Sequence, residues 1–251
     1  MVMKKGFWII LCMFFIPLVT FAGNMKLHYD RPAEYFEEAL VIGNGTMGAT
    51  LYGGVKKDKI SFNDITLWTG EPESENSSPD AFNVIPEIRA LLDNEDYEGA
   101  DKAQYKVQGH YSENYQPLGT LTIEYLDDTA GISDYHRWLD IGNATARTQY
   151  LKDGKLFTSD YFASAPDSVI VIRLKSENKE GIHALLSFDS PLPHSSQVAD
   201  NEISVEGYAA YHSFPVYYKA EDKHRYDPER GIHFKTCLLY TSDAADDLTR
   251  V

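Results

Sequence analysis

Residues Leu118–Tyr125 read LGTLTIEY, and the alternation places Leu121, Ile123 and Tyr125 on one face. A hydrophobic period of two indicates a β-strand, because successive side chains of a strand point to opposite sides of a sheet. This stretch therefore predicts a strand that buries one face against a hydrophobic core.

Similar patterns recur on both sides of this stretch. Runs rich in β-branched and aromatic residues alternate with turn signals such as Pro166-Asp167. The runs are residues 49–55 and 60–62, which suggest a hairpin over a charged turn at 56–59, then 135–149, 155–162, 168–174, 183–188, 202–206 and 231–235. Short strands with few helices between them predict an all-β fold, an antiparallel sandwich, rather than alternating strand–helix units.

Residues 81–108 depart from this pattern and predict a short helical insertion. Pro86 suits the first position of a helix, and residues 96–107 continue as a second short amphipathic helix. Helical spacing links four apolar residues of the first helix, Ile85, Ile88, Leu91 and Leu92. Residues 191–200 and 219–230 are expected to be long exposed loops.

Residues 1–22 are predicted to be a signal peptide. Lys4 and Lys5 form a basic start, residues 7–21 are apolar, and cleavage is expected after Ala22. The apolar run is shorter than the ~20 residues that a membrane span needs. We therefore expect an exported bacterial protein, periplasmic or extracellular, that has no membrane contact after cleavage.

The net charge of the chain excludes some classes of binding partner. Removing the two lysines of the signal takes the formal net charge from −15 to −17. Such an acidic chain is not attracted to nucleic acid phosphates or to anionic lipid, and it suits neutral substrates. Only Cys237 remains after cleavage, so the exported chain can form no internal disulfide.

Residues 237–251 (CLLYTSDAADDLTRV) differ from the sequence before them. The segment has no hydrophobic period and resembles the translation of a transposon adapter used in sequencing libraries. We therefore expect a non-native tail at 237–251, a domain spanning residues 23–236, and a natural protein that continues beyond the domain.

The segment Gly43-Asn44-Gly45-Thr46-Met47-Gly48 matches the pattern GxGxxG. That pattern binds a dinucleotide only when the glycines lead into a helix whose N-terminus holds the pyrophosphate. The next residues, 49–55, favour a strand instead. The segment is interpreted as a tight turn in which Gly45 or Gly48 has a positive φ.

Other chemical motifs are weak. The eight histidines are scattered, without HxH or HExxH spacing, and no metal site or cofactor is expected. Adjacent acids such as Glu37-Glu38 and Asp127-Asp128 carry no motif for glycoside hydrolysis, and no GxSxG elbow is present. No catalytic residue is therefore assigned within this chain.

The segment Asn63–Gly70 (NDITLWTG) is more suggestive. An indole can stack on the apolar face of a sugar ring, and an amide can bond its hydroxyl groups. Asn63 and Trp68 are thus the candidate substrate-binding residues. The alternative is a core tryptophan whose N–H finds a backbone partner.

Residues 27–72 also resemble the start of glycoside hydrolase family 95. The shared features are Tyr29-Asp30-x-Pro32-Ala33, Glu38-Ala39-Leu40, the glycine segment, and Asn63-x-x-Thr66-Leu67-Trp68-x-Gly70. Further matches are Tyr115-Gln116-Pro117-Leu118-Gly119 and the stretch from Tyr135 to Asp167. The chain departs from the family pattern at Ser159-Asp160 and at Val41.

The resemblance implies an N-terminal β super-sandwich of an α-L-fucosidase. Members of the family release L-fucose from fucosylated glycans with inversion and without a metal, and a minority prefer L-galactosidic bonds. Their general acid and the residues that hold the attacking water lie in an (α/α)6 barrel, which this chain lacks. We therefore expect the parent protein to be a glycosidase and this fragment to be inactive.

Two other classes of protein remain open at this point. The chain could be a free-standing carbohydrate-binding sandwich, or a structural β domain of an envelope assembly. The adapter-like tail favours the truncated enzyme, because it explains why a member of the family would lack its barrel.

Overall fold

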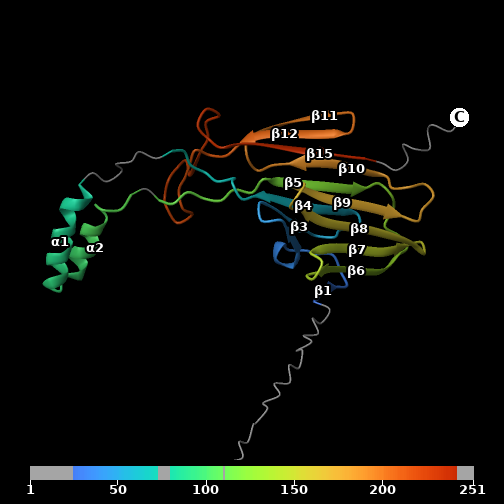
Figure 1. Cartoon of the computed structure of the whole chain (residues 1–251), viewed down its shortest axis with the longest axis horizontal. Coiled ribbons are helices and arrows are strands. Elements are labelled where there is room, and N and C mark those ends of the chain that lie inside the picture. The colour runs from blue at the N-terminus through green and yellow to red at the C-terminus, as the bar shows by residue number, and fades with distance from the viewer. Residues whose placement is uncertain (1–24, 73–79, 110, 242–251) are drawn as a thin grey trace, which may run out of the picture.

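The computed structural model describes residues 25–72, 80–109 and 111–241. The predicted signal peptide and residues 242–251 of the predicted tail lie outside the described residues. Antiparallel strands dominate the described part, as Figure 1 shows. The predicted all-β sandwich with a short helical insertion is confirmed.

Two five-stranded antiparallel sheets form the main body. The first has the order β1 (Lys26–Tyr29), β6 (Ile132–Asp140), β7 (Thr145–Lys152), β8 (Lys155–Ser164), β9 (Val169–Ser176). The second has the order β10 (Ala184–Asp189), β5 (Gly119–Tyr125), β4 (Lys57–Asp64), β3 (Met47–Leu51), β2 (Leu40–Gly43).

The remaining elements are smaller. A third sheet has the order β11 (His194–Ala199), β12 (Glu202–Tyr208), β15 (His233–Leu239), and a two-stranded ladder joins β13 (His212–Ser213) to β14 (His224–Arg225). The helical elements are η1 (Phe36–Glu38), α1 (Ala81–Asp93) and α2 (Tyr97–Gln104). Within the described residues, no helix is long and apolar enough to cross a membrane.

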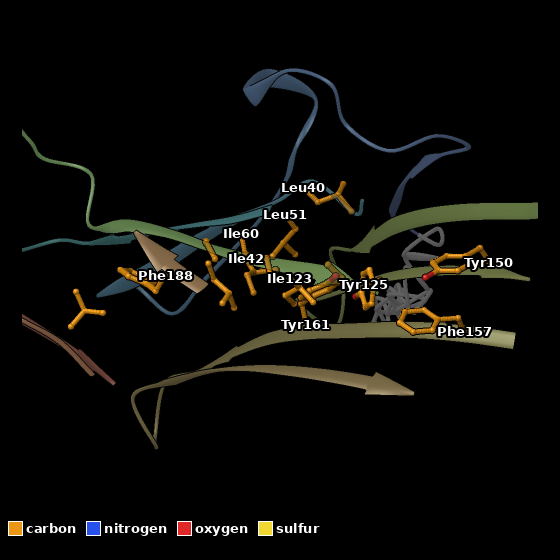
Figure 2. Packing of buried hydrophobic residues seen from close by; sticks show 14 residues of the cluster. Leu40, Ile42, Leu51, Ile60, Ile123, Tyr125, Tyr150, Phe157, Tyr161 and Phe188 are labelled. Atoms are coloured by element: carbon orange, nitrogen blue, oxygen red, sulfur yellow. The ribbon is translucent and has the colours of Figure 1, made fainter. Parts of the chain in front are cut away.

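The core lies between the two main sheets. The alternating residues Leu121, Ile123 and Tyr125 of β5 are all buried, as their spacing predicts. Tyr150 and Tyr161 of the opposite sheet belong to the same cluster, and Figure 2 shows Tyr161 beside Ile123 and Tyr125 in the interior. The cluster also includes Val205 of the third sheet, so one core joins all three sheets.

Several strand boundaries differ from the sequence-based prediction. The pattern at 135–149 is divided between β6 and β7 by a turn at residues 141–144. The first hairpin turns at residues 52–56 rather than 56–59, because β4 begins at Lys57 and turns Asp58 inward. β15 continues through Leu239, where Leu238 packs against the core and Cys237 pairs with Ser204.

The expected loop at 191–200 contains a strand, β11, and this part of the prediction is wrong. All six residues of β11 are exposed, so no burial pattern marks them in the sequence. The strand exists because its backbone pairs with β12 in an antiparallel register. Backbone hydrogen bonding at a sheet edge requires no hydrophobic period.

The helical insertion forms a hairpin that lies away from the sheets in Figure 1. Val84 of α1 and Ala100 and Ala103 of α2 are its buried residues. Pro86 lies inside α1 rather than at its first position, because the residues from Ala81 onward are already helical. In this second turn the ring removes the N–H that would otherwise bond the Phe82 carbonyl, so Pro86 weakens the helix locally.

The glycine segment is a turn between β2 and β3, and a strand rather than a helix follows it. Asn44 Oδ1 accepts hydrogen bonds from the backbone N–H of Thr46 (3.0 Å) and of Met47 (2.8 Å). Gly45 has a φ of 97°, which confirms the prediction that Gly45 or Gly48 has a positive φ. The strand β3 that follows the glycines confirms that they do not lead into a helix N-terminus, which the dinucleotide pattern requires.

Replacing Gly45 with Ala should lower the free energy of unfolding by about 1 kcal/mol, because an L side chain is strained at this φ. An added Cβ would have no neighbour within 4 Å, so the cost is one of backbone conformation alone. Gly48→Ala is the matched control, since its Cβ would meet only Ile42 O at 3.5 Å. Urea denaturation measures both variants, and equal losses would contradict the assignment of strain to Gly45.

Candidate functional site

Three loops meet beyond the start of β5 and the end of β4, and we call this region the loop end. It comprises residues 65–72, 111–118 and 209–232. Backbone hydrogen bonds join the loops, from Thr69 N to Asn114 O (2.8 Å) and from Gly70 N to Ala210 O (3.1 Å). In Figure 1 these segments lie side by side between the sheets and the helical hairpin.

Trp68 lies outside the hydrophobic core, with 44% of its surface exposed. Its Nε1 donates a hydrogen bond to Ile65 O (3.0 Å), and its ring lies edge-on to Tyr115 with centroids 5.5 Å apart. The neighbouring Leu67 is only 1% exposed and fills a small second core with Leu192 and Ala209. The loop is therefore anchored by Leu67, while a large part of the Trp68 surface stays accessible.

Asn63 lies in β4, opposite Gly48 of β3, and is half-buried. No hydrogen bond between Asn63 and Trp68 occurs among the described residues. The structure thus places the two predicted residues on the same strand-to-loop segment without a hydrogen bond between them. That either residue contacts a sugar stays a prediction.

Glu113 connects the three loops, and sequence reasoning missed it. Its carboxylate accepts hydrogen bonds from the Thr69 hydroxyl and from Ser213 N (3.1 Å), and it bonds His212 Nδ1 (2.7 Å). Asn114 N donates to the Thr69 hydroxyl oxygen (2.9 Å), which completes the network. The partners are separated by 44 to 100 positions, so no local motif could reveal them.

A second acid at the loop end is also paired. Arg230 Nε donates to Glu71 Oε2 (2.7 Å), and the Arg230 guanidinium lies 3.7 Å from the centroid of the Tyr211 ring. The hydrogen bond from Arg230 lowers the pKa of the Glu71 carboxyl below its ordinary value. Glu71 and Glu113 therefore hold the loops in place, because their carboxylate oxygens are taken up by hydrogen bonds between the loops.

An enclosed hollow exists at the opposite end of the sandwich. Its floor contains the stacked rings of Tyr150 and Phe157, whose centroids are 4.8 Å apart. Charged residues including Asp127, Lys152 and Lys155 surround it. None of the residues predicted to bind substrate lies there. Among the described residues, no group of three or more metal-ligating side chains is close enough to hold an ion.

The fold and the loop end define a β-sandwich domain that presents exposed aromatic side chains on its loops. The family described as "Glycosyl hydrolase family 65, N-terminal domain" matches residues 27–245. The chain belongs to this family of glycoside hydrolase N-terminal domains.

Relatives with named activities match the same region. Alpha-L-fucosidase 2 of Arabidopsis thaliana is 31% identical over 221 residues, which are 85% of this chain and 26% of the relative. The probable alpha-fucosidase A of Aspergillus niger is 30% identical over 67% of this chain and 22% of its own length. That of Aspergillus oryzae is 27% identical over 55% of this chain and 20% of its own length. The chain thus spans about a quarter or less of these relatives.

Because Trp68 lies outside the core, Trp68→Ala should lower the free energy of unfolding by only about 1–2 kcal/mol. The adjacent change Leu67→Ala should cost more, roughly 3–5 kcal/mol, since it empties a fully buried position. Chemical denaturation of the two variants measures the difference. A loss for Trp68→Ala that equals or exceeds the loss for Leu67→Ala would make the indole an ordinary core residue.

Proposed function

We propose that the chain is the N-terminal domain of an exported, inverting α-L-fucosidase of glycoside hydrolase family 95. The observation that carries this proposal is the 31% identity to Alpha-L-fucosidase 2, which extends over 85% of the chain. The chain corresponds to only 26% of that relative, so most of a protein of that length lies elsewhere. The sequence motifs around Asn63 and Trp68, which resemble those of family 95, support the assignment to that family in particular.

In this proposal the loop end faces the missing (α/α)6 barrel of the parent protein. Trp68 stacks on the apolar face of L-fucose, and Asn63 bonds a sugar hydroxyl. The exposure of the indole and its anchoring through Ile65 O support a preformed contact. A binding group that is already held in place loses little conformational entropy when the sugar arrives.

The general acid and the residues that hold the attacking water belong to the barrel in this proposal. Inversion requires two carboxyl groups about 6.5–9.5 Å apart across the scissile bond, with room for a water between them. Glu113 does not suit the role of either one, because its oxygens are bonded to Thr69, His212 and Ser213.

Export and the substrate class are part of the same proposal. The basic and apolar residues before Gly23 support secretion to the periplasm or the cell exterior. The formal net charge of −15 supports action on neutral, fucosylated glycans rather than on nucleic acid or anionic lipid.

The alternative is a free-standing carbohydrate-binding or structural sandwich, which predicts a shorter coding sequence. In that case the natural coding sequence ends soon after β15. In the enzyme, it continues for roughly twice the length of this chain, because the matched 145–221 residues are only 20–26% of the relatives. Amplifying the genomic region downstream of the codon for Lys235 distinguishes the two.

The chain from residue 23 onward should hydrolyse an aryl α-L-fucoside no faster than buffer, because the general acid and base are absent. The full-length protein should release L-fucose, and NMR of the first product should show inverted anomeric configuration. Full-length protein without fucose release would refute the fucosidase. Turnover by the chain alone that is abolished by Glu113→Gln would refute the placement of the catalytic groups.

A further inference from the structure

A second group of aromatic rings lies at the loop end, beside the region of Trp68. Tyr111, Phe214, Tyr217 and Tyr218 form this group, which we call the tyrosine platform. Tyr217 is 75% exposed, Tyr111 and Tyr218 are also exposed, and Phe214 is half-buried beneath them. Large exposed rings of this kind commonly mark a binding surface.

The rings contact one another and so form a defined surface. Phe214 and Tyr218 are stacked, with centroids 4.7 Å apart and planes 13° from parallel. Tyr111 lies edge-on to Tyr218 at 5.3 Å and to Tyr217 at 6.3 Å. Edge-on and stacked arrangements are the favourable geometries for aromatic pairs.

Hydrogen bonds hold the platform in its shape. Tyr218 N donates to Pro215 O (2.9 Å), and Phe214 N donates to Lys223 O (2.9 Å). Lys223 Nζ also donates to Val216 O (2.6 Å), which closes the turn that carries the tyrosines. The platform is therefore preorganised for binding a ligand, and ordering it adds little to the cost of association.

The platform is connected to the Trp68 loop. The His212 ring lies edge-on to Phe214 at 4.4 Å and bonds Glu113, whose carboxylate accepts from the Thr69 hydroxyl. Thr69 is the residue after Trp68. The Glu113 carboxylate thus links the Trp68 loop to the tyrosine platform and fixes the position of one relative to the other.

The chemistry of the platform favours a neutral carbohydrate. Residues 216–221 and Lys223 line an open groove that combines ring faces and phenol groups with Lys219, Glu221 and Lys223. Ring faces suit the C–H face of a pyranose, and the polar groups suit its hydroxyls. An acidic polymer would be repelled by a chain whose formal net charge is −15.

We propose that the tyrosine platform binds the sugar units of a neutral glycan that lie next to its terminal fucose. This inference rests on the proposed function, because the Trp68 region is taken to receive the fucose. The platform would then select glycans by the sugar to which the fucose is attached.

The test measures binding of three probes to the chain from residue 23 onward, by saturation-transfer NMR and titration calorimetry. The probes are free L-fucose, lactose, and the trisaccharide in which fucose is attached to lactose. Tyr218→Ala and Tyr217→Ala should weaken binding of lactose and of the trisaccharide by about fivefold to tenfold. Binding of free L-fucose should stay unchanged in both variants.

Tyr97→Ala is the matched control, because Tyr97 is 66% exposed on α2 and belongs to no part of the loop end. Equal affinities of the control and the platform variants for lactose would overturn the proposal, and so would the absence of lactose binding to any form. A dimer of the unmodified chain that Tyr217→Ala dissociates would instead make the platform a contact between copies. These outcomes are separate from fucose release by the full-length protein, which decides the proposed function independently.

Discussion

A hydrogen bond across the interior between the two main sheets determines how the rest of the structure is arranged. The Tyr161 hydroxyl of β8 donates to the Asp58 carboxylate of β4 over 2.8 Å, and both residues are only 1% exposed. Burial raises the pKa of Asp58 to about 6, against the opposing effect of hydrogen bonds from Gly54 N and Tyr161. A shift of β4 by one residue would bury Lys59 in place of Asp58, so this pair specifies the register of the strand.

The register of β4 in turn places the candidate site. β4 ends at Asp64, and in the loop that follows Trp68 is exposed while Leu67 packs into the small second core. Glu113 then joins the loops around these two residues, because its carboxylate bonds the Thr69 hydroxyl and the His212 ring. In the proposed function this scaffold presents sugar-binding groups on its loops, and the rest of the parent protein supplies the acid and base.

Periodicity in the sequence predicted the parts of the fold in which one face of a strand is buried. The alternation of β5 is the clearest example, because Leu121 and Ile123 contact the core while their neighbours do not. The same reasoning could not find β11, whose residues are all exposed and whose pairing is a property of the backbone. Local composition indicated Trp68, but the Glu113 network joins residues up to 100 positions apart and leaves no local signal.

The pH dependence of stability tests the buried Asp58 most directly. Because its pKa rises from an ordinary 3.8 to about 6 on folding, the folded chain holds this proton more tightly than the unfolded chain does. Its contribution to stability is therefore fully present below about pH 4 and is lost as the pH rises through about 6. The unfolding free energy of the unmodified chain, minus that of Asp58→Asn, should fall by roughly 2–2.5 kcal/mol between pH 4 and pH 7. A difference that stays constant over this range would show that Asp58 is not buried between the sheets.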